Sequence, residues 1–176
     1  MSIDNKIISI DNAMLIVDSI VLCYGHFNLI HPGHLRYLQH AKTLANKLIV
    51  VIRSDEELDK DSFGQHFTED ERAESVANLQ IVDGVIILNQ LTLDKLVDIV
   101  KPSVLVLGKE FEQKQPKYIS SAISAVRKQG KTVFHAGEAH YATSNLLHGN
   151  VLDIEKTSVD SFKAICKNHK LTLNTL

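Results

Sequence analysis

The sequence predicts an α/β protein in which helices cover both faces of a parallel sheet. Short apolar runs rich in β-branched residues alternate with helical patterns, as in stacked βαβ units. These runs do not alternate apolar with polar residues, which is typical of strands that are buried on both faces. No internal repeat or low-complexity segment interrupts the alternation.

The first half of the chain contains two expected strands and two expected helices. The apolar runs Ile20–Tyr24 and Leu48–Ile52 predict strands, and His34–Ala45 between them carries apolar residues at helical spacing. The T-x-x-E capping box of residues 68–71 predicts a helix that ends near Leu79.

The second half continues the alternation. Leu93–Val100 has apolar residues at positions i, i+3, i+4 and i+7 and stops before Pro102, which predicts a helix. Another helix is expected from Pro116 to Gly130, where a glycine suits the C-cap. The strands expected in this half are Val85–Leu88, Val104–Leu107 and Thr132–Phe134.

Two segments lack these patterns. Residues 53–67 are polar and contain glycine, so a mobile loop is expected after the second strand. Residues 151–176 are rich in Lys and Asn, with one apolar stripe at residues 159–166. We expect residues 1–150 to form one domain. The tail is either a helix packed on the body or on a partner subunit, or a linker.

Composition excludes several classes of function. The chain has 176 residues, 44% of them apolar, and a formal net charge of −2. This length supports one domain with a proper core, and the charge gives no broad basic field for nucleic acid or membranes. The apolar runs are far shorter than the ~20 residues that span a bilayer. The two cysteines lack motif spacing, so we expect reduced thiols in a cytoplasmic protein.

The stretch from Gly25 to His34 predicts an anion-binding site directly after the first strand. Gly25 allows a tight turn that brings backbone N–H groups close to a ligand. The helix start that follows presents unpaired N–H groups and a partial positive charge, which favour phosphate. His31 and His34 can face one phosphate, and Gly33 between them leaves its approach open. The alternative is that the two histidines only cap the helix.

This stretch, GHFNLIHPGH, resembles the G-x-F-D-x-x-H-x-G-H signature of the cytidylyltransferase-like nucleotidyltransferases. Residues 20–150 look most like the nucleotidyltransferase domain of bacterial ADP-heptose synthases, and they also resemble the glycerol-3-phosphate cytidylyltransferases. The other segments that carry the resemblance, in collinear order, are Arg53-Ser54-Asp55, Glu71-Arg72 with Val82-Asp83, Leu107-Gly108-Lys109-Glu110-Phe111 and Tyr141-Ala142-Thr143-Ser144-Asn145-Leu146-Leu147.

The resemblance implies a Rossmann-like three-layer sandwich with a five-stranded parallel sheet. It also implies a reaction in which a substrate phosphate oxygen attacks the α-phosphorus of ATP or CTP and pyrophosphate leaves. Such chemistry needs no covalent nucleophile, because catalysis is positioning plus stabilisation of the growing charge. Mg²⁺ is expected with the triphosphate, held by phosphate oxygens and water rather than by a protein metal site.

The resemblance also assigns roles to residues. His31 and His34 would contact the triphosphate, with His34 stabilising the transition state, and Lys60 would reach across the phosphates. The nucleotide-binding residues that it implies are Gly25, His26 and Phe27 at the α-phosphate, then Gly33, Gly108, Lys109 and Glu110, and finally Thr143 and Ser144 at the β- and γ-phosphates.

Several of these residues have structural alternatives. Lys60 lies among acidic residues and is alternatively a solvated charge, and Thr143 with Ser144 alternatively forms a plain N-cap. Glu71 and Arg72 equally suit a capping interaction and a surface ion pair. The lysines expected to be ordinary exposed side chains are Lys42 and Lys47.

Three departures from the family pattern bear on function. Asn28 stands where most relatives have Asp, which removes a charge from that position. Lys109 and Glu110 replace a more usual acidic pair, so substrate contacts near the fourth strand are expected to differ. An arginine is missing before the Thr143 segment, and His140 there substitutes only in part because imidazole is mostly neutral at pH 7.

We therefore expect a nucleotidyltransferase that makes a nucleotide-linked sugar or alditol for cell-surface polysaccharide. Adenylyl transfer to a heptose-1-phosphate-like acceptor is favoured over cytidylyl transfer to glycerol phosphate, and the sequence leaves ATP versus CTP open. The expected partners are the NTP, a phosphorylated small molecule and a second copy of the chain. The rival hypothesis is a nucleotide-binding protein without turnover. ADP-heptose synthases commonly fuse this domain to a sugar kinase.

Overall fold

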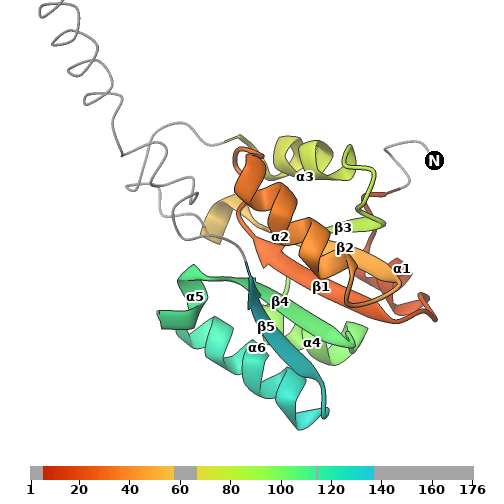
Figure 1. Ribbon diagram of the computed structural model, residues 1–176, viewed down its shortest axis with the longest axis vertical. Helices are drawn as coiled ribbons and strands as arrows, with labels where there is room; N and C mark the ends of the chain where they lie inside the picture. The colour runs from red at the N-terminus through yellow and green to blue at the C-terminus, as the bar shows by residue number, and fades with distance from the viewer. Residues whose placement is uncertain (1–5, 58–66, 114, 137–176) are drawn as a thin grey trace, which may run out of the picture. The chain divides into compact units, whose positions relative to one another are not determined.

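The computed structural model describes residues 6–57, 67–113 and 115–136, and at their centre is a five-stranded, all-parallel sheet (Figure 1). The strands are β1, Ile20–Gly25; β2, Lys47–Arg53; β3, Gly84–Leu88; β4, Val104–Gly108; and β5, Thr132–Ala136. Their order across the sheet is β3-β2-β1-β4-β5. The predicted Rossmann-like fold and all five predicted strands are confirmed.

The strand order reverses at β1. This strand pairs with β2 on one side, where Gly25 faces Ile52, and with β4 on the other, where Cys23 faces Val106. Open parallel sheets bind ligands outside the carboxyl ends of the strands at such a reversal. The turn that follows Gly25 therefore lies where the topology favours a ligand.

Helices cover both faces of the sheet. The described residues form α1, Ile10–Met14; α2, Pro32–Lys42; α3, Glu69–Ala77; α4, Leu93–Val100; α5, Glu110–Gln113; and α6, Lys117–Lys128. Helices α2 and α3 pack on one face, and α1, α4 and α6 pack on the other (Figure 1). This arrangement is the predicted three-layer sandwich.

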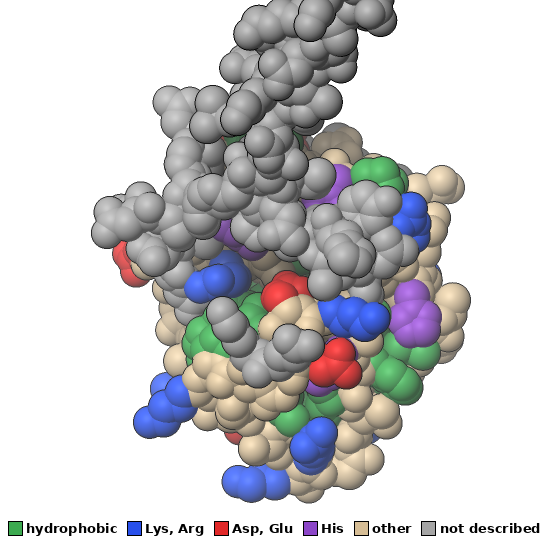
Figure 2. Space-filling view, turned by 60° about the vertical axis from the view of Figure 1, so that its left-hand side comes forward, with side chains coloured by type: hydrophobic (Ala, Val, Ile, Leu, Met, Phe, Trp, Pro, Cys, Tyr) green, Lys and Arg blue, Asp and Glu red, His purple; other side chains and the backbone are tan. Residues whose placement is uncertain are grey.

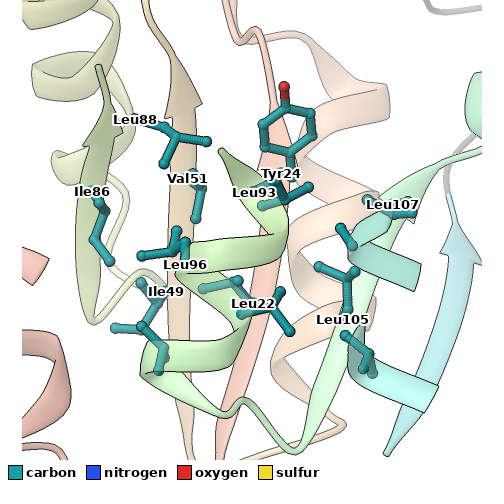
Figure 3. Close-up of a cluster of buried hydrophobic side chains, with 14 of the residues drawn as sticks. Leu22, Tyr24, Ile49, Val51, Ile86, Leu88, Leu93, Leu96, Leu105 and Leu107 are labelled. Atoms are coloured by element: carbon teal, nitrogen blue, oxygen red, sulfur yellow. The ribbon is translucent and has the colours of Figure 1, made fainter. Parts of the chain in front are cut away.

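Alternate residues of the strands enter two separate hydrophobic layers. Leu22 and Tyr24 of β1 join the layer under α4 and α6, while Val21 and Cys23 join the layer under α2 and α3. Figure 3 shows Leu93 of α4 above Leu22, near the end of β1, and the Tyr24 hydroxyl pointing beyond the strand ends. Burial of one such leucine stabilises the fold by about 1.5–3 kcal/mol.

The boundaries of some elements differ from the expected ones. The helix expected at His34–Ala45 begins earlier, because Pro32 occupies its first turn, where the missing N–H costs nothing, and it ends at Lys42. Gly130 follows α6 with φ 69°, as a glycine past a helix end often does. The short helices α1 and α5 had no sequence prediction, since neither is long enough to show periodicity.

Lys42 and Lys47 are not ordinary exposed lysines, so that prediction was wrong. The Lys42 ammonium lies 2.5 Å from Oδ2 of Asp83, and Lys47 lies 3.6 Å from Oδ1 of the same carboxylate. Oδ2 of Asp83 also accepts the Leu48 N–H at 2.8 Å. The three side chains join the end of α2 to the amino-terminal edge of β2.

The tail 151–176, the boundary expected at residue 150 and most of the loop expected at 53–67 lie outside the described residues. At the start of that loop, Asp55–Glu57 forms a 3₁₀ turn. Cys23 is a buried free thiol, and burial raises its pKa to about 12. None of the described helices has the length and apolar character needed to cross a membrane.

Candidate active site

The turn after β1 is shaped by contact between a glycine and a phenylalanine. Phe27 has φ 53°, a left-handed conformation that non-glycine residues rarely adopt. Its ring is 2% exposed and folds back beneath the turn, so a Cβ on Gly25 would lie 2.7 Å from the ring. Gly25 is therefore required by close packing, which is a more specific reason than the tight turn that the sequence suggested.

His31 and His34 lie against each other at the start of α2. Their rings are stacked with centroids 3.9 Å apart and planes inclined by 29°. The Phe27 ring lies next to His34, with a centroid distance of 4.9 Å. The structure thus brings the predicted histidine pair together and packs one of its rings against the phenylalanine of the turn.

The two histidines use their Nδ1 atoms in opposite ways. Nδ1 of His31, the N-cap residue of α2, accepts the Gly33 N–H at 3.1 Å. Nδ1 of His34 lies 2.9 Å from the Leu29 carbonyl oxygen and therefore donates to it. Any contact with a phosphate must come from Nε2 in both rings. Capping and ligand binding are compatible, since each uses a different nitrogen of His31.

This hydrogen bonding fixes the tautomers of the neutral rings. Neutral His31 carries its proton on Nε2, so that atom can donate to a phosphate oxygen. Neutral His34 carries its proton on Nδ1, so its Nε2 must take up a proton before it can donate. Burial, and then the neighbouring His31, lowers the pKa of His34 to about 4, although the Leu29 bond opposes the shift. Burial also lowers the pKa of His31.

Arg72 is the centre of a buried network that the sequence did not reveal. The residue is 1% exposed, and its guanidinium donates to the carbonyl oxygens of Phe67 (3.0 Å), His26 (2.8 Å) and Arg53 (2.8 Å). It also bonds Oδ1 of Asp55 at 2.7 Å. Of the two alternatives for Glu71 and Arg72, the capping interaction of Glu71 is present and the surface ion pair is wrong. The sequence did contain one sign that Arg72 is buried, because Arg72 shares a helix face with the buried Val76.

Two further bonds hold the segments that Arg72 joins. Asp55 and Glu69 each accept the other's backbone N–H, at 2.9 and 3.0 Å. Asn28 is 7% exposed, and its side-chain oxygen accepts the Phe67 N–H at 2.9 Å. Asn28 thus holds the residues before α3 against the β1 turn. Burial opposes ionisation of Asp55, but its bonds to Arg72 and Glu69 outweigh that effect, so its pKa is lowered.

Some of the other predicted site residues lie in the part of the chain that the structure describes, and the rest lie outside it. Gly108 ends β4 beside β1. The Glu110 carboxylate folds back over this strand end, so close that a Cβ on Gly108 would overlap it. Lys109 and Glu110 are exposed. Buried Gly33 gives its N–H to His31. The predicted residues outside the described part of the chain are Lys60, His140, Thr143 and Ser144.

Aromatic residues flank the site on the α6 side. Tyr24 lies 6.2 Å from Phe111 and 6.3 Å from Tyr118, measured between ring centroids. The Arg53 guanidinium lies over the Tyr118 ring at 5.6 Å. The sequence noted Phe111 only as part of a family motif and did not reveal the cluster, because its members come from three separate elements. On the face shown in Figure 2, acidic and basic side chains of the described residues are interspersed.

These features define a class of protein: a parallel α/β fold with a glycine turn and a histidine pair at its topological reversal, where such folds bind ligands. The sequence model of the cytidylyltransferase-like family matches residues 22–146. The chain belongs to this family of nucleotidyltransferases.

Known relatives agree with this assignment. Bifunctional protein HldE of Helicobacter pylori (strain 26695) is 34% identical over 114 residues, which cover 62% of this chain and 25% of HldE. The FAD synthase of Picrophilus torridus is 34% identical over 88 residues, 50% of this chain and 63% of that protein. The chain thus spans about a quarter of the HldE proteins that it matches.

Solved structures show the same fold. The lipopolysaccharide core biosynthesis protein of Thermoplasma volcanium superposes with a TM-score of 0.57 at 28% identity, covering 69% of this chain and 98% of that one. Pantoate-beta-alanine ligase of Francisella tularensis, at 18% identity and a TM-score of 0.54, shares the fold alone.

Arg72→Met should destabilise the protein severely. It removes the donors to three carbonyl groups and the partner of half-exposed Asp55, and each buried carbonyl left without a donor typically costs about 1–3 kcal/mol. Urea unfolding measures the loss, with Arg127→Met on the exposed side of α6 as the control. Equal free energies of unfolding for the two variants would contradict the network's importance.

Stability should fall as the pH drops from 6.5 to about 4, in part because of His34. The unfolded chain binds a proton at an ordinary histidine pKa, whereas folded His34 resists it until about pH 4. His34→Gln should therefore lose less free energy of unfolding between pH 7.5 and pH 5 than the parent. His40→Gln, an exposed histidine on the same helix, is the control. Identical losses in all three proteins would show that His34 titrates normally.

Proposed function

We propose that the protein transfers AMP or CMP from ATP or CTP to a phosphorylated sugar or alditol and releases pyrophosphate. A heptose-1-phosphate-like acceptor is favoured, with glycerol phosphate as the alternative. The observation that carries the proposal is the stacked His31–His34 pair at the start of α2, beside the Gly25 turn. The similarity to HldE proteins and to a lipopolysaccharide core biosynthesis protein supports a sugar acceptor.

In this mechanism an acceptor phosphate oxygen forms a bond to the α-phosphorus, and the bond from that phosphorus to the leaving pyrophosphate breaks. The nucleophile is already ionised, so the protein needs only to align it and stabilise negative charge. Neutral His31 can donate from Nε2 in the ground state. His34 can donate from Nε2 once the triphosphate raises its pKa and it takes up a proton.

Mg²⁺ is proposed to enter with the NTP, held by phosphate oxygens and water, and to neutralise charge on the leaving group. The turn after β1 fits this arrangement, in which no side chain has to hold the metal. Asn28 stands where the family has Asp, and its side-chain oxygen accepts the Phe67 N–H, so this oxygen is used to hold the fold together. Lys60, Thr143 and Ser144 remain proposed phosphate ligands.

ATP or CTP with Mg²⁺ should raise the melting temperature by roughly 5–10 °C. A ligand at about 100 times its Kd adds about 2.7 kcal/mol, and each kcal/mol is worth about 2–4 °C in a chain of this size. Differential scanning fluorimetry with all four triphosphates tests this. If none of the four shifts the melting curve at millimolar concentration, the phosphate site is wrongly assigned.

Replacing each histidine should separate catalysis from capping. His34→Ala should reduce kcat by about 10²–10³ with little loss of stability, as for loss of one preorganised donor. His31→Ala should reduce turnover and also cost about 1 kcal/mol of stability, because its Nδ1 caps α2. Pyrophosphate release and urea unfolding are measured on the same samples, with His40→Ala as control. A His34→Ala protein with normal turnover would exclude the catalytic role.

A further inference from the structure

Three apolar side chains of the described residues face solvent where α1 leads into β1. Met14 is 58% exposed, Leu15 76% and Val17 101%. Ala13 of the same segment belongs to the hydrophobic layer under α4 and α6, so these side chains lie beside that layer (Figure 1). Exposed apolar side chains this close together are typical of a surface that binds another protein.

A groove of about 470 Å³ lies between the neighbouring helices α4 and α6. Asp94 and Asp98, one helical turn apart, line its α4 side. Its α6 side is lined by three serines and, nearer the two ends of the helix, by Lys117 and Lys128. No ion pair of these four charged side chains is found within the part of the chain that the structure describes, although Asp98 accepts the Gln129 amide N–H at 3.1 Å. The groove therefore presents both signs of charge to a partner.

The surface formed by α1, α4 and α6, which we call the α1–α4–α6 face, has two halves of opposite charge. Residues 9–19, which include α1, contain Asp11 and Asp18 and no Lys or Arg. Helix α4 adds its two carboxylates against one ammonium, that of Lys95. Residues 115–136, which include α6, contain four Lys and Arg residues and no Asp or Glu. The half on α1 and α4 is therefore acidic, and the half on α6 is basic.

A face of this kind is complementary to itself. A two-fold axis joins the same patch of two copies, so a residue on one half of the patch meets the other half in the partner. The acidic half of each copy then meets the basic half of the other, and both contacts are attractive. A partner of one charge sign, such as a nucleic acid, would be repelled by one half of the face.

We propose that the α1–α4–α6 face binds a second copy of this chain to form a two-fold dimer. Asp94 and Asp98 of each copy lie against Lys117 and Lys128 of the other, and the exposed apolar side chains beside α1 are covered by the other copy's α6, including its lysine stems. The histidine pair lies at the start of α2, on the opposite face of the sheet, so both candidate active sites stay open. The inference goes beyond the proposed function and does not depend on it.

The test reverses the charges on one side of the groove at a time in the full chain. Asp94→Lys with Asp98→Lys makes the groove basic on both sides, and Lys117→Glu with Lys128→Glu makes it acidic on both sides. Light scattering after size-exclusion chromatography should give twice the chain mass for the parent at micromolar concentration. Each double variant should dissociate, with a dimer Kd at least about tenfold higher, because like charges then face each other. A mixture of the two double variants should dimerise again, since a basic groove then meets an acidic one.

Two further variants test the apolar part of the face and the specificity of the effect. Leu15→Asp puts a charge among the exposed apolar side chains and should also weaken the dimer, without disturbing the core. Asp70→Lys with Glu74→Lys reverses two exposed carboxylates one turn apart on α3, which packs on the other face of the sheet, and this control should leave the dimer intact.

Three results would overturn the proposal. The first is a parent protein that stays monomeric at micromolar concentration. The second is a dimer that withstands both groove variants and Leu15→Asp as well as it withstands the α3 control. The third is a mixture of the two groove variants that fails to dimerise. None of these results bears on nucleotide binding or turnover, so the proposed function is tested separately.

Discussion

The buried guanidinium of Arg72 is the constraint on which the site depends. It fixes the backbone that follows β1, the backbone that ends β2 and the residues before α3, through one planar group with five donors. Removing such a charge from water is expensive, and only several short bonds together offset the cost. The carbonyl of His26 is one of those partners, so the turn that is proposed to hold the α-phosphate cannot shift without breaking the network.

A second chain of contacts runs from that turn to the histidines. Gly25 admits the Phe27 ring, Phe27 packs beside His34, and His34 stacks on His31. Each contact fixes the orientation of the next ring, so the two Nε2 atoms are oriented before a ligand arrives. The hypothesis that the histidines cap the helix and the hypothesis that they bind phosphate therefore do not compete. His31 caps with Nδ1, so a bound phosphate would meet its other ring nitrogen, Nε2.

The sequence predicted those features that depend on neighbours along the chain. The five apolar runs became strands, and the Thr68–Glu71 capping box is present with both of its bonds. Features set by contacts between distant segments were missed: the burial of Arg72, the Lys42–Asp83 pair and the bond from Phe67 to Asn28. Charged residues are expected at the surface by default, and only the fold shows which carbonyl groups need a cation. Lys60, Thr143 and Ser144 stay predictions.

The charges at the described site lead to one further conclusion about how a triphosphate would be attracted. The net charge of the chain is −2, Arg72 is neutralised by Asp55, and both histidines have lowered pKa values. Before a ligand arrives, the turn after β1 itself offers dipoles, namely its backbone N–H groups, the start of α2 and the Nε2–H of His31. Such dipoles would bind a phosphate with little reorganisation, and the incoming charge would then favour the protonated form of His34. On this account, the low pKa of His34 would let this imidazole become positively charged only when a nucleotide is present to neutralise it.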